Sequence, residues 1–89
     1  MSKKLSLDET IGQLKALDRG LDYAQLAERL KLLPAVLSEK HQAIVAFWRG
    51  KLAVLGGSYA EAIRELARSA ELAPNNAAGK YLLGSALVR

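Results

Sequence analysis

The chain has 89 residues, 51% of them hydrophobic and 25% charged, with a net charge of +4. A chain of this length forms one domain and is too apolar to be disordered. It contains no cysteine and a single histidine, which excludes disulfides, thiolate metal sites and histidine-based metal clusters. Aromatic residues make up only 6%, and leucine and alanine dominate, which favours helix over sheet.

The positive charge permits binding to nucleic acid or to an acidic peptide but does not require it, because a mildly basic solvated surface explains it equally well. No run of like charges is longer than Lys3-Lys4, and no secretory leader or stretch of 18 apolar residues occurs. We therefore expect a cytoplasmic protein without membrane contact.

Two helices are expected between residues 6 and 33. Ser6 and Glu9 form a capping-box pattern at the start of the first, and Gly20 suits the left-handed position after its end. Asp22 can cap the second helix. The apolar positions have helical spacing: Leu7, Ile11, Leu14 and Leu17, then Ala24, Leu26, Ala27, Leu30 and Leu33.

Pro34 prevents the second helix from continuing unperturbed, and a new helix can begin there. A third helix is predicted from about Ala35 or Ser38 to Leu55, and the pair Gly56-Gly57 ends it. Its apolar residues are Ile44, Val45, Phe47, Trp48, Leu52, Val54 and Leu55.

The fourth predicted helix follows Ser58, which caps it, with Glu61 at capping-box distance. A turn at residues 74–76 separates it from a fifth helix over 77–89. The expected buried side of the fourth helix comprises Ala62, Ile63, Leu66, Ala70 and Leu72. The fold class is therefore all-α, with five helices in antiparallel hairpins joined by short connections.

An internal repeat supports this arrangement. The segment 20–25 recurs at 56–61, a shift of 36 residues, and the same shift places Leu30 on Leu66. A second coincidence relates Gly50 to Gly84, 34 residues apart. Both spacings are typical of repeats in which one helical hairpin stacks on the next.

The sequence here resembles the tetratricopeptide repeat (TPR) family, through Gly50, Gly57, Tyr59, Ala62, Leu66, Pro74 and Leu83-Gly84. It differs from that family's pattern at Arg49, usually leucine, and at Ser69, usually alanine. The resemblance implies about two and a half stacked repeats in a single domain over 1–89. These are a degenerate first hairpin at 6–33, a TPR-like hairpin at 35–73 and an unpaired terminal helix at 77–89.

The residues do not form a catalytic, cofactor or metal pattern. His41 has no neighbouring cysteine and no second histidine, which favours a surface or boundary position. Glu61 and Glu65 lie four apart, as on a solvated helix face. Lys80 follows a glycine but lacks the rest of a phosphate loop. We therefore expect a protein that is not an enzyme and that binds no cofactor.

A DNA-binding alternative rests on residues 26–38, which are similar to the helix-turn-helix of bacterial repressors. The second helix of that motif would run from Ala35 to Gln42, where only Lys40 and Gln42 are candidates for contacts with base edges. Lys31 and Leu33 occupy positions that this motif usually gives to glycine and a capping serine. Packing of helical hairpins explains the same residues. Nucleic acid therefore remains a less favoured partner.

The TPR resemblance implies a non-catalytic scaffold or adaptor that binds a protein or peptide partner in an apolar groove. Carried over onto this chain, the groove positions are Ile44, Phe47, Trp48, Lys51, Val54, Ala78, Tyr81, Leu82 and Ser85. The first hairpin would add Ile11 and Lys15. Such a groove suits an amphipathic helix or an extended apolar segment. Phe47 and Trp48 can instead fill the core between hairpins.

The terminal helix carries apolar residues around most of its circumference. One side is expected to pack on the fourth helix through Leu83 and Leu87 or their neighbours. Tyr81, Leu82 and Val88 in some combination are then left open to water. An exposed apolar stripe on a small domain favours association. We therefore expect self-association through residues 77–89, or a chain that continues beyond Arg89. The family also occurs as an accessory domain of longer enzymes, such as transferases, which is a third alternative.

Overall fold

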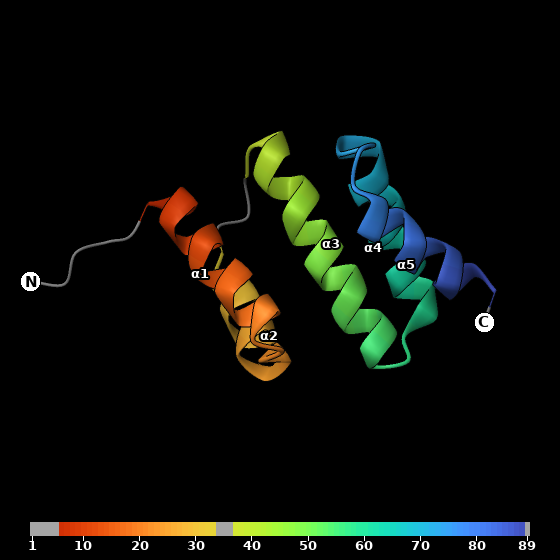
Figure 1. The fold of residues 1–89 in the computed structure, drawn as a ribbon, viewed down its shortest axis with the longest axis horizontal. Helices are drawn as coiled ribbons and strands as arrows, with labels where there is room; N and C mark the ends of the chain where they lie inside the picture. The colour runs from red at the N-terminus through yellow and green to blue at the C-terminus, as the bar shows by residue number, and fades with distance from the viewer. Residues whose placement is uncertain (1–5, 34–36, 89) are drawn as a thin grey trace, which may run out of the picture. The chain divides into compact units, whose positions relative to one another are not determined.

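The computed structural model describes residues 6–33 and 37–88. All regular secondary structure within these ranges is helical, so the all-α prediction is confirmed. The five helices, shown in Figure 1, are α1 (Leu7–Arg19), α2 (Tyr23–Leu30), α3 (Glu39–Leu55), α4 (Tyr59–Leu72) and α5 (Ala77–Leu87).

The helices fall into two compact units, one holding α1 and α2 and the other holding α3, α4 and α5. The division follows Leu33, where the predicted first hairpin ends. Pro34 and Ala35, at which a new helix was expected to begin, lie outside the described residues. Helix α3 starts after Ser38, the later of its two predicted starts. The organisation of the chain as a single repeat domain stays a prediction.

The first unit is a short hairpin closed by leucines. The predicted capping box is confirmed: the Ser6 hydroxyl accepts from the Glu9 N–H at 3.1 Å, and the Ser6 N–H donates to the Glu9 carboxylate at 3.4 Å. Leu14 and Leu26 are fully buried. Ala24, expected on the apolar side of α2, is exposed, because it lies about 200° around the helix from Leu26 at 100° per residue.

The end of α1 differs from expectation by one residue. Gly20 is the C-cap with φ −80°, and Leu21 occupies the left-handed region with φ 60°. The Asp22 N–H donates to the Leu17 carbonyl at 2.9 Å, and the Leu21 N–H donates to the Asp18 carbonyl at 3.1 Å. This is a Schellman motif, which requires its left-handed residue one position beyond the C-cap. The assignment of that conformation to Gly20 was therefore wrong.

The same motif recurs 36 residues later, at the end of α3. Here Gly57 takes the left-handed position with φ 80°, and its N–H donates to the Val54 carbonyl at 3.1 Å. The Ser58 N–H donates to the Ala53 carbonyl at 2.8 Å. The sequence repeat is thus a repeat of backbone structure. Leu21 is the strained member of the pair, because a side chain in this region crowds the neighbouring carbonyl oxygen.

The two helices that follow these turns are capped differently. Asp22 and Ser58 share almost the same backbone, with ψ 70° and 71°. The Asp22 carboxylate accepts from the Gln25 N–H at 3.2 Å, as predicted, whereas Ser58 makes no side-chain capping bond. With this backbone the longer aspartate side chain reaches the helix and the serine hydroxyl does not. The capping box predicted between Ser58 and Glu61 is therefore absent.

In the second unit α3 packs on α4, and α5 packs on α4 and on part of α3. Leu66 of α4 lies against Gly50 of α3, where an added Cβ would be only 2.5 Å from the Leu66 Cγ. Ala62 and Leu66 are fully buried, as predicted for this side of α4. Glycine at position 50 thus allows the two helices to approach closely.

A serine completes this interface, which the apolar pattern did not indicate. Ser69 is 1% exposed, and its hydroxyl donates to the Ala43 carbonyl oxygen at 2.8 Å. One residue earlier on each helix, at the surface, Arg68 donates to the Gln42 side chain at 3.2 Å. The hydrogen bond to Ala43 explains how a serine occupies a buried position that the TPR pattern usually gives to alanine.

Candidate functional site

The nine residues expected to line a groove lie on α3 and α5, and we call them the α3–α5 strip. Phe47 and Trp48 are buried, with 9% and 1% of their surface exposed. Ala78 and Tyr81 are exposed, and the remaining members, Ile44, Lys51, Val54, Leu82 and Ser85, are partly exposed. The two large aromatic residues of α3 are therefore core residues, in line with the alternative interpretation of them.

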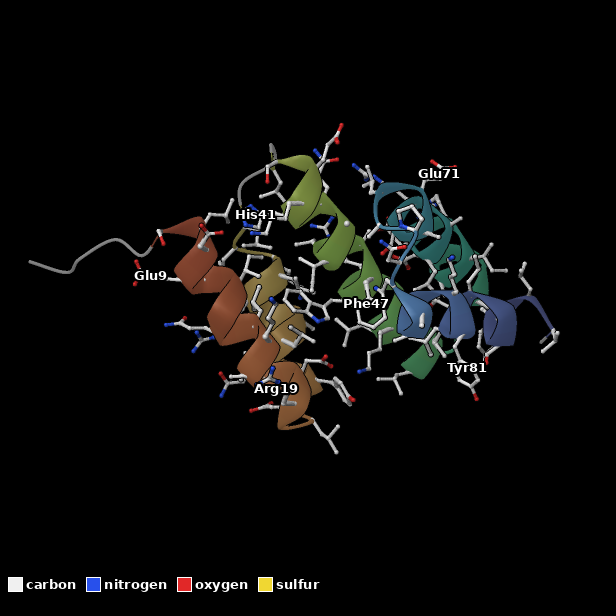
Figure 2. All side chains as sticks on the ribbon, turned by 45° about the horizontal axis from the view of Figure 1, so that its top comes forward. Glu9, Arg19, His41, Phe47, Glu71 and Tyr81 are labelled. Atoms are coloured by element: carbon white, nitrogen blue, oxygen red, sulfur yellow. The ribbon has the colours of Figure 1, made fainter. Side chains whose placement is uncertain are left out.

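Contacts around Phe47 connect the two helices of the strip. An added Cβ on Gly79 of α5 would lie 3.5 Å from the Phe47 ring. The Lys51 ammonium nitrogen is 5.9 Å from the centre of the same ring, within the range of a cation–π interaction. Figure 2 labels Phe47 in the second unit and shows Tyr81 pointing outward from α5. Phe47 is thus a buried residue that contacts both helices of the strip, and Lys51 supplies a positive charge at the surface of the strip.

The strip offers few directed polar groups. Lys51, Ser85 and the Tyr81 hydroxyl are its polar members, and the other members that keep some exposure are aliphatic. This chemistry suits apolar contact with a segment that also carries an acidic side chain. Of the two residues added from the first hairpin, Ile11 is buried and Lys15 is exposed.

His41 is buried, rather than at the surface or boundary position expected of it. It is 9% exposed, and its ring nitrogen Nδ1 lies 3.0 Å from the Ser38 hydroxyl. The same hydroxyl accepts from the His41 N–H at 3.4 Å and caps α3. The histidine is therefore part of a helix start. Among the residues that the structure describes, no three His, Asp or Glu side chains gather as a metal site would need.

Glu61 and Glu65 of α4 do not share one solvated face. Glu61 is exposed, but Glu65 is half-buried, and its Oε2 atom is buried without a hydrogen-bond partner. The spacing of four residues correctly places Glu61 and Glu65 on one side of the helix. It does not show that the Glu65 side chain is partly covered by other residues. Lys80 is exposed on α5, as expected of a solvated helix residue.

The stretch that resembles a helix-turn-helix does not form the expected second helix over 35–42. Ser38 is extended, with ψ 158°, and α3 begins only at Glu39. Gln42, one of the two candidate base-reading residues, uses its side chain within the protein: it donates to the Leu37 carbonyl and accepts from Arg68. Lys40 is exposed. None of the helices in the described ranges has the length and apolarity needed to cross a bilayer.

Helix α5 matches the expectation in part: Leu83 is half-buried, whereas Leu87 is 61% exposed and its neighbour Ala86 is buried in its place. The buried positions of α5 are Gly79 and Ala86, and Leu82 and Leu83 are half-buried. These residues lie on the side of the helix opposite Gly84, at 100° per residue. Tyr81 and Val88 are 75% and 85% exposed, as expected of the open side.

Gly84 is exposed and lies on this open side together with Leu87. The spacing of apolar residues within α5 did not predict that these two residues share an exposed side. Its signal in the sequence is the shift of 34 residues that relates Gly84 to Gly50. Comparison of the chain with protein-family models, with curated proteins and with solved structures found no significant match.

Proposed function

We propose that this protein is a non-catalytic interaction module that binds an apolar segment of another polypeptide along the α3–α5 strip. The observation that carries the proposal is the set of partly exposed aliphatic residues on two adjacent helices, supported by the buried Phe47 and flanked by Lys51. The resemblance to TPR repeats supports the same function. The favoured ligand is an amphipathic helix or extended segment with an acidic residue close to Lys51.

The test is a titration of the ¹⁵N-labelled protein with two synthetic peptides of equal composition. One is an amphipathic helix with leucines on one face and glutamate beside them, and the other is its scrambled form. The proposal expects the amphipathic peptide to shift the amide signals of Ile44, Lys51, Leu82 and Ser85. It expects the scrambled peptide to leave them in place.

Lys51→Glu provides the matched variant, because Lys51 is half-exposed and the substitution reverses the charge of the strip. This variant should keep the helical circular dichroism spectrum and bind the amphipathic peptide several-fold more weakly. A peptide with lysine in place of glutamate should show the opposite preference. Equal shifts with both original peptides, or shifts located outside the strip, would contradict the proposal.

A further inference from the structure

Five residues of α5 and its C-cap residue Val88 form one exposed face, which we call the open face of α5. At 100° per residue they span about 120° of the helix. Each is exposed, and the three largest apolar side chains among them are 61–85% exposed. The residues are Ala77, Lys80, Tyr81, Gly84, Leu87 and Val88. The open face shares only Tyr81 with the α3–α5 strip, so it is a second surface.

The repeat relates this face to a covered face of α3. A shift of 34 residues moves the six positions onto Ala43, Ala46, Phe47, Gly50, Ala53 and Val54. None of these is exposed, and all but Val54 are buried. Helix α4 lies on this side of α3, as the contacts of Gly50 with Leu66 and of Ala43 with Ser69 show. The open face of α5 is therefore the equivalent of a helix-binding face.

The two glycines show the difference at atomic scale. A Cβ added at Gly50 would be 2.5 Å from the Leu66 Cγ, whereas a Cβ added at Gly84 meets no atom within 4 Å. Gly84 thus leaves space for a leucine that the described residues do not supply. Tyr81 and Leu87 lie on the same face of the helix, one turn before and one turn after this space.

The contacts of α3 also define the direction of a covering helix. Gly50 of α3 contacts Leu66 of α4. Ala43, which precedes Gly50 in α3, contacts Ser69, which follows Leu66 in α4. The helices are therefore antiparallel. Ala46 lies one turn before Gly50, between these two contacts, so the residues that follow Leu66 in α4 lie towards it. On α5 the equivalent of Ala46 is Lys80, the only charged residue of this helix.

We infer that the open face of α5 binds an antiparallel amphipathic helix of another polypeptide, with a leucine on Gly84 and an acidic residue one turn later, close to Lys80. Small residues four before and three after the leucine, like Ala62 and Ser69 of α4, allow the close approach. Charge complementarity with Lys80 favours such a helix over a second copy of this chain. The copy's α4 is buried on its own α3, and its α5 has no acidic residue.

The probe is a peptide with the sequence of residues 58–73, because α4 is the helix that fits the equivalent face. It carries Ala70→Glu to meet Lys80. The peptide also carries Arg64→Glu and Arg68→Lys, at two positions that are exposed in α4, and an amide (lactam) bond formed between these two side chains with loss of water keeps it helical, since a free peptide of this length is only marginally helical. A fluorescent label at its N-terminus allows binding to the whole protein to be followed by anisotropy.

The wild-type protein should bind this peptide, and Gly84→Leu should weaken binding by about tenfold or more, because it fills the position of one buried leucine. Gly12→Leu is the matched control, since Gly12 is also an exposed helical glycine with open space around its Cβ position. It should leave the affinity unchanged. Leu87→Glu is a second variant of the open face and should also weaken binding.

Changes in the peptide test the same contacts from the other side. Leu66→Asn in the peptide should abolish binding, and lysine in place of the introduced glutamate should weaken it. Lys51→Glu in the protein should not matter, which separates this inference from the function proposed for the α3–α5 strip. Undetectable binding to the wild type, or equal binding to Gly84→Leu, overturns the inference. So does a dimer in light scattering that Gly84→Leu dissociates, because a second copy then covers the face.

Discussion

Gly50 of α3 and Gly84 of α5 are equivalent positions with opposite surroundings. Gly50 is buried beneath Leu66, and the space beside Gly84 is open. The comparison teaches that the same loss of helix propensity at a glycine is compensated in one environment and not in the other. At Gly50 the loss of helix propensity is offset by close packing of two helices, whereas at Gly84 no group in the described residues makes use of the missing side chain.

The largest change in the free energy of unfolding is expected at Leu66, the leucine that covers Gly50 and has no counterpart at Gly84 in the described residues. Leu66→Ala removes a fully buried side chain and leaves a cavity over Gly50, which should lower the free energy of unfolding by about 3 kcal/mol. Leu87→Ala is the matched control on α5, where the side chain is 61% exposed, and should change stability by less than about 0.5 kcal/mol. Urea denaturation followed by circular dichroism measures both. Equal losses would contradict the packing described for α3 and α4.

Alanine in place of Gly50 and alanine in place of Gly84 should change the free energy of unfolding in opposite directions. Gly50→Ala gains helix propensity but forces Leu66 to move, with a net loss of about 1–2 kcal/mol. Gly84→Ala has no such conflict and should raise stability by about 1 kcal/mol. The same denaturation measurements decide the point. A stabilised Gly50→Ala variant would show that α3 and α4 do not approach as closely as the structure describes.

The serines of the two regions provide a smaller contrast. Ser69→Ala removes the buried hydrogen bond to the Ala43 carbonyl and should cost about 1 kcal/mol, reduced slightly by the better helix propensity of alanine. Ser85→Ala on α5 removes a half-buried hydroxyl and should be neutral or slightly stabilising. Thermal unfolding of both variants measures the difference. A neutral Ser69→Ala variant would show that the hydrogen bond contributes nothing to stability.

The smallest expected effects test the backbone repeat on which the comparison rests. Leu21→Gly relieves the left-handed strain and should stabilise the protein by about 0.5 kcal/mol, because part of the gain is lost to the greater freedom of glycine in the unfolded chain. Gly57→Ala introduces the same strain and should destabilise by about 1 kcal/mol. Chemical denaturation of the two variants is the check. Changes of the same sign would show that the two turns are not equivalent.

The sequence predicts the helices well, because their ends carry local signals. The capping box of Ser6 and Glu9 and the cap formed by Asp22 depend on neighbouring residues, and both are confirmed. Gly20 was assigned the wrong conformation because composition alone does not show which residue of a turn follows the C-cap. Ser58 fails as a side-chain cap because its hydroxyl does not reach the helix at a ψ of 71°, whereas the longer Asp22 side chain does so with almost the same backbone.

The candidate site was harder to predict than the fold, because helical spacing does not show which neighbour covers a face. Phe47, Trp48 and Tyr81 were all assigned to the groove, yet Phe47 and Trp48 are buried and Tyr81 is exposed. Leu83 and Leu87 or their neighbours were expected to pack on α4, and the buried residue is Ala86, whereas Leu87 is 61% exposed. Burial depends on contacts between residues distant in the sequence. Only the 34-residue shift carries information about such contacts.

Disulfide trapping tests most directly whether the open face of α5 receives a helix in the register of α4. The chain has no cysteine, so an introduced pair reports on a single contact. In α3 and α4, Ala53 and Ala62 lie one turn from the Gly50–Leu66 contact, and the equivalent of Ala53 is Leu87. Leu87→Cys in the protein should therefore form a disulfide with the stapled peptide carrying Ala62→Cys, because the two Cα atoms must come within about 7 Å. The same protein variant should not form one with a peptide carrying cysteine at position 70. Equal trapping of both peptides, or preferential trapping at position 70, would contradict the account.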